Sequence, residues 1–365
     1  MRVKLEDVCE REASNLKQSD VVGLKGDYPV YGASGRIGNV DFYHQENSYV
    51  AVVKDGAGIG RTTLHPAKSS VIGTMQYLLP KNNVLPEYLY YVVSYMHLEK
   101  YFTGATIPHI YFKDYKNEKF NLDPVDTQKQ VVDVLGKCEA VIESRKRELQ
   151  LLDDLIKARF VEMFGTLHDN ENGFAVVAIE DVCSLIKDGT HQTPQYTEDR
   201  EEGFKFLSSK DVMSQKIDWT DIKYIPVELH EKLYATIKPQ RNDVLMSKNG
   251  VNYGVAAVND TDEVFDIYVS LALLRPKEII DSVFLRCVIN NPETKRQFDS
   301  SIKGIGVPNL HLGEIRKTKI LLPPMEFQKE FVTFVEQVDK SKVAVQKALT
   351  EAQLLFDSLM QQYFG

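Results

Sequence analysis

A glycine-rich segment, Gly56–Arg61, follows an apolar run in the first part of the chain. Alternating glycines after a strand are typical of loops whose backbone amides hold a phosphate. The dinucleotide-binding fingerprint, however, needs its third glycine one residue later and a helix directly after it. Residues 62–66 end in Pro66 and make a poor helix start. The Gly-Lys-Ser or Gly-Lys-Thr of a P-loop is also missing. We therefore expect a hairpin turn that presents Lys54 and Arg61 to an anionic surface.

Two further loops place basic and amide side chains near glycines. Lys248 and Asn249 stand directly before Gly250, and the polar segment Ile186–Pro194 carries His191 at its centre. Such side chains donate hydrogen bonds to phosphates or to base edges. His191 has no nucleophile or carboxylate beside it in a recognisable catalytic pattern, so we interpret it as a loop contact and not as a general base.

No other pattern in the sequence predicts chemistry. Gly32–Gly35 lacks the spacing of a G-x-S-x-G nucleophile turn, and the eight histidines show no metal-ligand spacing. The four cysteines are scattered singly, without a C-x-x-C pair, which disfavours both disulfides and a thiolate zinc site. We expect no catalytic residue, no metal and no cofactor.

The chain of 365 residues contains an internal repeat with a period near half its length. It begins with Leu5–Cys9, which is echoed by Ile179–Cys183. Farther on, matched residues stay 200 positions apart: Gly104 and Gly304, Pro108 and Pro308, Lys119 and Lys319, Pro124 and Pro324, Gln128 and Gln328, and Phe164 and Phe364. A register held this long predicts a duplication whose two copies differ by insertions in their middles.

Each copy begins with a part that mixes short strands with glycine-rich turns. Apolar runs rich in β-branched and aromatic residues predict strands at Ser48–Val53, Val71–Leu78 and Ile267–Leu274. A short helix is expected after each such part, at Pro86–His97 and at Asp281–Asn290.

Each copy ends in a segment that predicts one long helix, at about 126–163 and about 326–363. Proline ends the extended stretch before each helix, and Gly136 is the one glycine or proline inside them. Apolar residues recur in steps of three and four, which is typical of a seam against another helix. The expected seam comprises Val131, Val134, Cys138, Val141, Leu149, Leu152 and Leu155, and Phe331, Phe334, Val338, Val345, Leu349, Leu355 and Leu359. We expect the two helices to pack as an antiparallel coiled coil, because the repeat then gives the single chain a pseudo-twofold axis.

These features predict an α+β protein in four parts. Two similar mixed α/β globular domains, at 1–125 and 169–325, are separated by long helices within 126–168 and 326–365. The composition, 43% apolar and 26% charged, is that of a globular chain. No run approaches the roughly 18 apolar residues of a membrane span, and the first residues do not form a secretory signal, so we expect a cytoplasmic protein. The net charge of −8 weakens the case for a polyanion partner, although local clusters decide such binding.

Together these motifs resemble the specificity subunits of Type I restriction-modification systems. The resemblance covers nearly the whole chain and is carried by the loop Asp188–Pro194, by Gly304-x-x-x-Pro308, and by the segment Leu321–Lys329 with its Pro324-x-x-x-Gln328 step. The first copy has weaker counterparts at Gly104-x-x-x-Pro108 and Leu122–Lys129, and it has no Asp-Gly-x-His loop around Tyr28–Gly32.

The resemblance implies a DNA-recognition subunit that performs no chemistry. Each globular domain would be a target recognition domain that reads one half of a bipartite, asymmetric site in double-stranded DNA. The helices would set the gap and dock methyltransferase subunits, two in number, which bind S-adenosylmethionine and methylate adenine, and a separate restriction subunit would cut. The candidate DNA contacts are Arg36, Lys54, Arg61, Lys187, His191, Gln192, Lys210, Lys248 and Asn249.

Two alternatives from other classes stay open at this stage. One is a nucleotide-dependent enzyme that uses Gly56–Arg61. The other is a duplicated scaffold that joins two proteins without touching DNA. Tight binding of a nucleotide to the isolated chain would favour the first, and a gel shift of the assembled complex would separate the second from a DNA reader.

Overall fold

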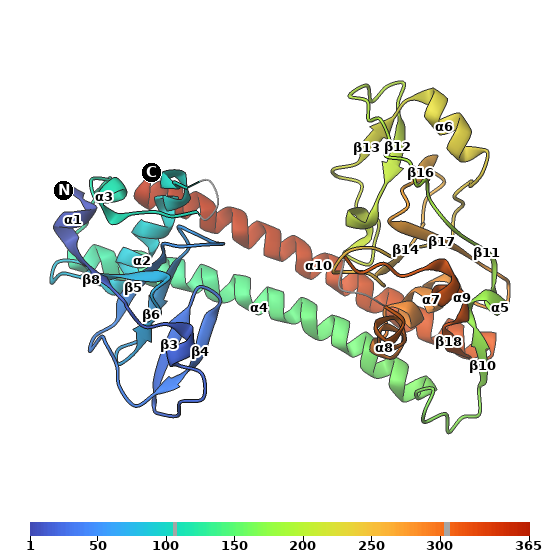
Figure 1. Ribbon diagram of the computed structural model, residues 1–365, viewed down its shortest axis with the longest axis horizontal. Helices are drawn as coiled ribbons and strands as arrows, with labels where there is room; N and C mark the ends of the chain where they lie inside the picture. Colours follow the sequence, from blue (N-terminus) through green and yellow to red (C-terminus); the bar gives the residue numbers. More distant parts are fainter. Residues whose placement is uncertain (105–107, 303–306) are drawn as a thin grey trace. The chain divides into compact units, whose positions relative to one another are not determined.

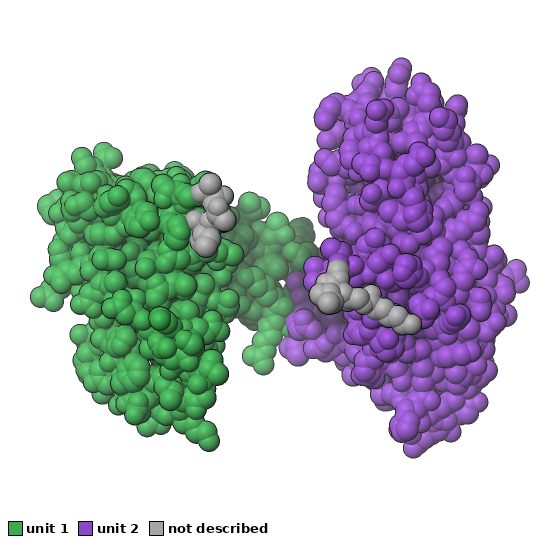
Figure 2. All heavy atoms as spheres, viewed as in Figure 1, with its two compact units in different colours: residues 1–148, 345–365 green, residues 149–344 purple. Residues whose placement is uncertain are grey.

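A computed structural model describes residues 1–104, 108–302 and 307–365. The chain forms two compact units (Figure 2): unit 1 comprises Met1–Glu148 and Val345–Gly365, and unit 2 comprises Leu149–Ala344. Two long helices, α4 (Val125–Phe164) and α10 (Met325–Phe364), each contribute to both units (Figure 1). We call the residues before α4 the first head and those between α4 and α10 the second head.

Among its described residues, the first head contains three sheets and several short helices. A four-stranded antiparallel sheet has the order β2-β8-β5-β6, a three-stranded sheet has the order β4-β3-β7, and β1 pairs with β9. The elements are β1 (Arg2–Lys4), α1 (Leu5–Val8), β2 (Cys9–Ala13), η1 (Gln18–Asp20), β3 (Tyr28–Gly32), β4 (Gly35–Val40), β5 (Tyr49–Val53), β6 (Thr62–His65), β7 (Ser70–Val71), β8 (Met75–Pro80), α2 (Pro86–Tyr95), η2 (Leu98–Tyr101), α3 (Phe112–Tyr115) and β9 (Lys119–Asn121).

The second head repeats this topology strand for strand. Its sheets have the orders β11-β17-β14-β15 and β13-β12-β16, and β10 pairs with β18. The elements are β10 (Ala175–Ala178), α5 (Ile179–Val182), β11 (Cys183–Asp188), β12 (Phe204–Leu207), η3 (Ser209–Val212), β13 (Lys223–Ile225), α6 (Val227–Tyr234), β14 (Val244–Ser247), β15 (Ala256–Val258), β16 (Phe265–Ile267), β17 (Leu271–Pro276), α7 (Ser282–Ile289), α8 (Pro292–Ser301), α9 (Leu312–Lys317) and β18 (Lys319–Leu322).

The match between the heads extends to the direction of pairing. In both three-stranded sheets one strand pair is antiparallel and the other is parallel: β3 with β4 and β7, and β12 with β13 and β16. The predicted duplication of two mixed α/β domains is therefore confirmed. The second head adds α6 between β13 and β14, in the middle of the copy where the repeat predicts insertions.

Two predicted strands are wrong in the same way. The run Val71–Leu78 is split into β7 and β8 by a turn at Gly73, and the run Ile267–Leu274 is split into β16 and β17 at the turn Tyr268–Ser270. Gly73 donates its amide to the Leu16 carbonyl, and a Cβ at that glycine would lie 3.1 Å from the Ser14 carbonyl oxygen. The apolar run thus crosses from one sheet to the other, which its hydrophobicity does not reveal.

The long helices lie within two residues of their predicted bounds because proline and glycine mark their ends. The Gln128 amide donates to the Pro124 carbonyl at the start of α4. At its end Gly165 adopts a φ of +71° and donates its amide to the Val161 carbonyl, as a glycine after a helix does. In unit 2 the helices run antiparallel, since Lys342 pairs with Asp153 at 2.5 Å whereas Glu330 pairs with Arg159 at 3.2 Å.

The predicted seam is partly wrong in register. The predicted seam residues Val141, Leu155 and Leu355 are about half exposed. By contrast, Leu135, Ile142 and Phe160, which are not in the predicted seam, are buried. Apolar residues spaced three and four apart are compatible with more than one choice of buried face along a long helix. The spacing alone therefore does not decide which of two neighbouring apolar residues is buried. A coiled coil along the full length of the helices stays a prediction.

A buried glutamine joins each head to its long helix. The Gln128 side chain accepts from the Leu85 amide at 2.9 Å and donates to the carbonyls of Asn83 and Asp123 at 2.9 Å. The same three contacts recur in the second head, where Gln328 accepts from the Asp281 amide and donates to two carbonyls. Both side chains are fully buried. The Pro-x-x-x-Gln step is therefore the joint between head and helix.

Among the helices of the residues that the structure describes, none is long and apolar enough to cross a membrane.

Candidate nucleic-acid interface

The glycine-rich segment of the first head is a tight hairpin loop. It joins β5 to β6, and the Gly60 amide closes it by donating to the Val53 carbonyl at 2.9 Å. Gly56, Gly58 and Gly60 all have φ near +80°, a conformation that side chains with a Cβ rarely adopt. Since the loop leads into a strand and not into a helix, it lacks the helix N-terminus that a dinucleotide-binding loop offers to phosphates. This geometry removes the main support for the nucleotide-dependent alternative.

The second head has the same loop between β14 and β15. Its Gly254 amide donates to the Ser247 carbonyl at 2.7 Å, as Gly60 does to Val53. The Gly56 and Gly250 amides donate to the carbonyls of Pro108 and Pro308, in both cases at 3.0 Å. The prolines of the two Gly-x-x-x-Pro motifs thus lie against matching loops. The motif residues 105–107 and 304–306 lie outside the described part of the chain.

In the first head, the three predicted contacts Arg36, Lys54 and Arg61 lie in or beside two neighbouring turns. Arg61 is exposed and donates to the Ala33 carbonyl at 2.9 Å, which ties the hairpin loop to the turn before β4. Arg36 lies on β4 directly after that turn, is exposed, and donates to Asn39 at 3.0 Å. Lys54, at the base of the hairpin loop, lies 3.3 Å from its neighbour Asp55. The three cations therefore belong to two adjoining loops.

In the second head, the turn Tyr268–Ser270 collects the predicted contacts. Thr190 forms a β-bridge with Tyr268, the Ser209 amide donates to the Ser270 hydroxyl, and the Lys248 amide donates to the Ser270 carbonyl, the last two at 2.9 Å. The turn thus brings together residues 187–192, 209–210 and 248–249. These segments are distant in sequence, and together they carry Lys187, His191, Gln192, Lys210, Lys248 and Asn249.

The side chain of Lys248 is buried, whereas the sequence analysis expects it to be presented to DNA. Its side chain is only 5% exposed, and its ammonium lies 2.6 Å from Asp188 Oδ2. His191 Nε2 lies 3.2 Å from the same oxygen, but the imidazole is 73% exposed. The prediction of a direct DNA contact from Lys248 therefore gives way to a structural role, in which it holds the carboxylate beneath the exposed His191.

The other candidates of the second head lie at the surface or close to it. Lys187 and Gln192 are exposed. Lys210 is also exposed; although burial favours its neutral form, hydrogen bonds and charges from Asp211 and Asp221 outweigh that effect and raise the pKa of Lys210. Lys210 therefore keeps its charge at neutral pH. Asn249 is half-buried, and its Oδ1 has no hydrogen-bond partner among the described residues.

Sequence reasoning missed two polar side chains at this interface, His109 and Asn309. His109 Nδ1 lies 2.6 Å from Asp55 Oδ1, beside the hairpin loop of the first head. Asn309 forms a β-bridge with Asn249 at the matching place in the second head. Both residues directly follow the prolines of the Gly-x-x-x-Pro motifs and stand 200 positions apart, so the repeat itself carried the signal.

Metal ligation and thiol chemistry find little support in the described residues. Across 1–104, 108–302 and 307–365, no three His, Cys, Asp or Glu side chains gather as metal ligands. All four cysteines are free. Burial raises the pKa of the Cys9 and Cys183 thiols to about 12, so these thiols are not nucleophilic thiolates at neutral pH.

Comparison with known proteins identifies the family. The family described as Type I restriction modification DNA specificity domain matches residues 1–153 and 171–353. The chain is 24% identical over 340 residues to the Type I restriction enzyme MjaVIII specificity subunit of Methanocaldococcus jannaschii, covering 86% of this chain and 79% of that protein. It is 22% identical over 291 residues to the EcoBI specificity subunit of Escherichia coli, covering 72% of this chain and 61% of that protein.

Solved structures share the fold. The Type I restriction-modification S subunit from M. genitalium superposes with a TM-score of 0.58 at 13% identity, covering 100% of this chain and 96% of that one. A chain from a structure of a type I R-M system gives a TM-score of 0.52 at 15% identity, covering 100% and 97%. Because the family matches both heads and most of both long helices, the chain belongs to the Type I restriction modification DNA specificity domain family, that of the Type I specificity subunits.

Proposed function

We propose that this chain reads a bipartite, asymmetric DNA target for a Type I restriction-modification complex. Each head reads one half of the target. The long helices fix the gap between the halves and dock methyltransferase subunits, two in number, with restriction subunits joining the full complex. The chain itself contributes recognition and no catalytic group.

The observation that carries this proposal is that the two heads have one topology but different loop chemistry at matched positions. At the β5–β6 hairpin loop of the first head, Asp55 contacts His109. At the matching β14–β15 loop of the second head, Asn249 forms a β-bridge with Asn309. A carboxylate with an imidazole and a pair of amides present different donors and acceptors. Each good base contact discriminates by about 1–3 kcal/mol. Two such heads select two different half-sites.

The proposed DNA contacts are exposed or half-buried polar residues in and beside these loops. In the first head they are Arg36, Lys54 and Arg61, and in the second head Lys187, His191, Gln192, Lys210 and Asn249. The net charge of −8 fits a reader whose partner subunits supply much of the non-specific attraction to phosphates.

The proposed docking of partners rests on apolar side chains that the long helices leave exposed. Val141, Leu151, Leu155, Val343, Leu354 and Leu355 are all between about one half and two thirds exposed. Exposed apolar side chains that a partner could cover are typical of protein interaction sites.

Replacing Arg61 and Lys187 by alanine tests the DNA contacts. In the complex assembled with methyltransferase subunits, each variant is expected to weaken binding to the target, measured by gel shift at several salt concentrations. Loss of one phosphate contact reduces the salt slope by about 1, whereas loss of a base contact relaxes the specificity instead. Lys129→Ala is the matched control, because Lys129 is exposed on α4 and pairs with Asp126.

Unaltered affinity, salt slope and specificity in both loop variants would move the contacts to other loops. An assembled complex that binds no DNA at all would instead favour the duplicated scaffold. Tight nucleotide binding by the isolated chain would revive the enzyme alternative.

A further inference from the structure

The second head contacts α10 through a buried arginine. Arg286 lies on α7, its side chain is 8% exposed, and both terminal guanidinium nitrogens lie 3.3 Å from Asp339 Oδ2. Asp339 lies on α10 and is 18% exposed. A charge so far from water requires a charged partner. The pair therefore joins α7 to α10 at a defined point.

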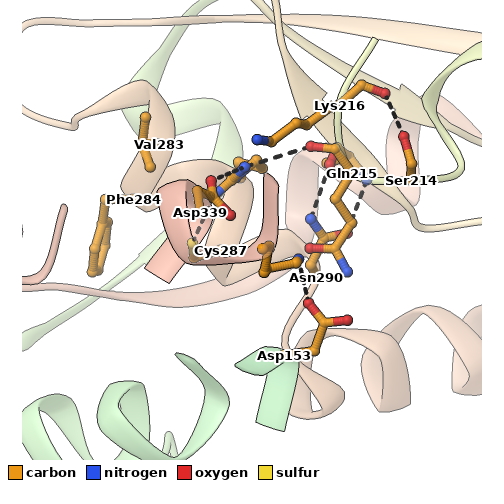
Figure 3. A network of polar contacts seen from close by, with 12 residues as sticks. Asp153, Ser214, Gln215, Lys216, Val283, Phe284, Cys287, Asn290 and Asp339 are labelled. Carbon is orange, nitrogen blue, oxygen red and sulfur yellow. Dashed lines mark hydrogen bonds and ion pairs between the residues drawn. The ribbon is translucent and has the colours of Figure 1, made fainter. Parts of the chain in front are cut away.

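The same guanidinium also reaches a third segment. It donates to the Gln215 carbonyl at 3.5 Å, in the loop between η3 and β13, where Gln215 has a φ of +60°. Figure 3 shows Gln215, Cys287 and Asp339 around this point, with the neighbouring Asp153 below them. Arg286 Nε is buried without a hydrogen-bond partner among the described residues. The Arg286 side chain thus links α7, the loop between η3 and β13, and α10.

The first head makes the equivalent contact with different residues. Glu139 on α4 accepts hydrogen bonds from Tyr90 at 3.2 Å and from Tyr91 at 2.7 Å, both on α2. Glu139 stands eleven residues after Gln128, as Asp339 stands eleven residues after Gln328. Both heads therefore make polar contacts with their long helix at two matching points.

The two points differ in what they restrain. The buried glutamine sits near the start of the long helix and holds the backbone of the head there. Beyond that point the head packs on the helix through apolar side chains, among them Phe284 of α7 against Phe331 of α10. The carboxylate lies eleven residues farther along, roughly 16 Å at the rise of an α-helix, and a second contact at that distance fixes the angle.

We propose that Asp339 and Glu139 are positioning residues that fix the angle of each head on its long helix, and that the Arg286–Asp339 contact thereby limits the gap at which the enzyme accepts its two half-sites. This inference rests on the proposed function. A tilt of one head displaces its half-site relative to the other, because both long helices continue from one unit into the next. A charged, directional pair defines the angle more narrowly than apolar packing, which tolerates sliding.

Asp339→Asn in the full chain tests the inference, because it keeps the shape of the side chain and removes its charge. The variant is assembled with the methyltransferase subunits, and methylated adenines are mapped across a genome. The half-sites are expected to stay the same, while methylation at gaps one base pair longer or shorter rises by about tenfold relative to the original gap, as a change of about 1.4 kcal/mol gives. Asp339→Glu retains the charge and is expected to restore discrimination. Glu336→Gln removes an exposed charge on the same helix and is expected to leave it unchanged.

Two results would overturn the inference. One is wild-type gap discrimination in Asp339→Asn; the other is an equal loss of methylation at every gap, which a purely structural role would give. If Asp339→Asn fails to assemble, Arg286→Gln, which removes the charge from the other partner, replaces it, with the same expected and contradicting results. The wild-type map separates this inference from the proposed function, since a target without a gap contradicts the proposed function before any variant is compared.

Discussion

Inserting four residues into both long helices is expected to lengthen the gap in the target by about two base pairs and to leave both half-sites unchanged. The sites are after Glu148 and after Ala344, where one unit ends and the other begins within each helix. Four residues add roughly 6 Å of helix, and base pairs rise by about 3.4 Å. Insertion in both helices keeps them equal in length, so the antiparallel contacts within each unit retain their partners. The inserted sequence Leu-Gln-Lys-Ala also continues the apolar periodicity.

A two-residue insertion at the same places is the matched control. Two residues rotate the rest of a helix by about 200°, whereas four residues rotate it by about 400° and nearly restore the phase of the apolar stripe. We expect the shorter insertion to abolish assembly and the longer one to preserve it. Methylated adenines mapped across a genome report the gap. An active four-residue variant with the original gap would show that these helices do not measure the spacing.

Replacing Gln328 by leucine is expected to destabilise unit 2 by about 3 kcal/mol or more. The substitution leaves one backbone amide and two carbonyls without partners in a fully buried place, and each unpaired group costs about 1–3 kcal/mol. Gln337→Leu, at an exposed position of the same helix within unit 2, is expected to change stability by no more than about 0.5 kcal/mol. Urea unfolding followed by tryptophan fluorescence measures the effect.

Trp219 is the single tryptophan of the chain and lies in the second head, so its fluorescence reports that head. Gln128→Leu makes the same change in the first head. We expect Gln128→Leu to lower the urea concentration at the midpoint of unfolding measured by circular dichroism. The midpoint measured by tryptophan fluorescence is expected to shift less. Equal tryptophan shifts for Gln128→Leu and Gln328→Leu would contradict the view that each glutamine serves its own head.

The features that could be predicted from the sequence are those that local chemistry determines. Pro124 and Gly165 mark the ends of α4, and the repeat predicts that α10 has the same bounds. The split of Ile267–Leu274 escaped prediction because its turn residues, Tyr268–Ser270, are as compatible with a strand as with a turn.

The candidate site was predictable only in part, for a different reason. The loops were found because glycines and basic residues stand together in the sequence. The burial of Lys248 depends on Asp188, sixty residues away, and the Arg286–Asp339 contact joins residues from two separate elements. Such partners are set by tertiary packing, which a single sequence does not display. The individual DNA contacts stay predictions.

The assignment of one half-site to each head is tested most directly by exchanging residues 1–123 for the same region of a related specificity subunit. The exchanged segment ends before Pro124, so Gln128 and both long helices are kept, while the backbone groups that Gln128 contacts come from the equivalent residues of the donor. Methylated adenines of a host that carries the chimera and its methyltransferase partner are then mapped. The account predicts that one half of the target changes to that of the donor while the other half and the gap stay as they were. A change in both halves, or in neither, would contradict it.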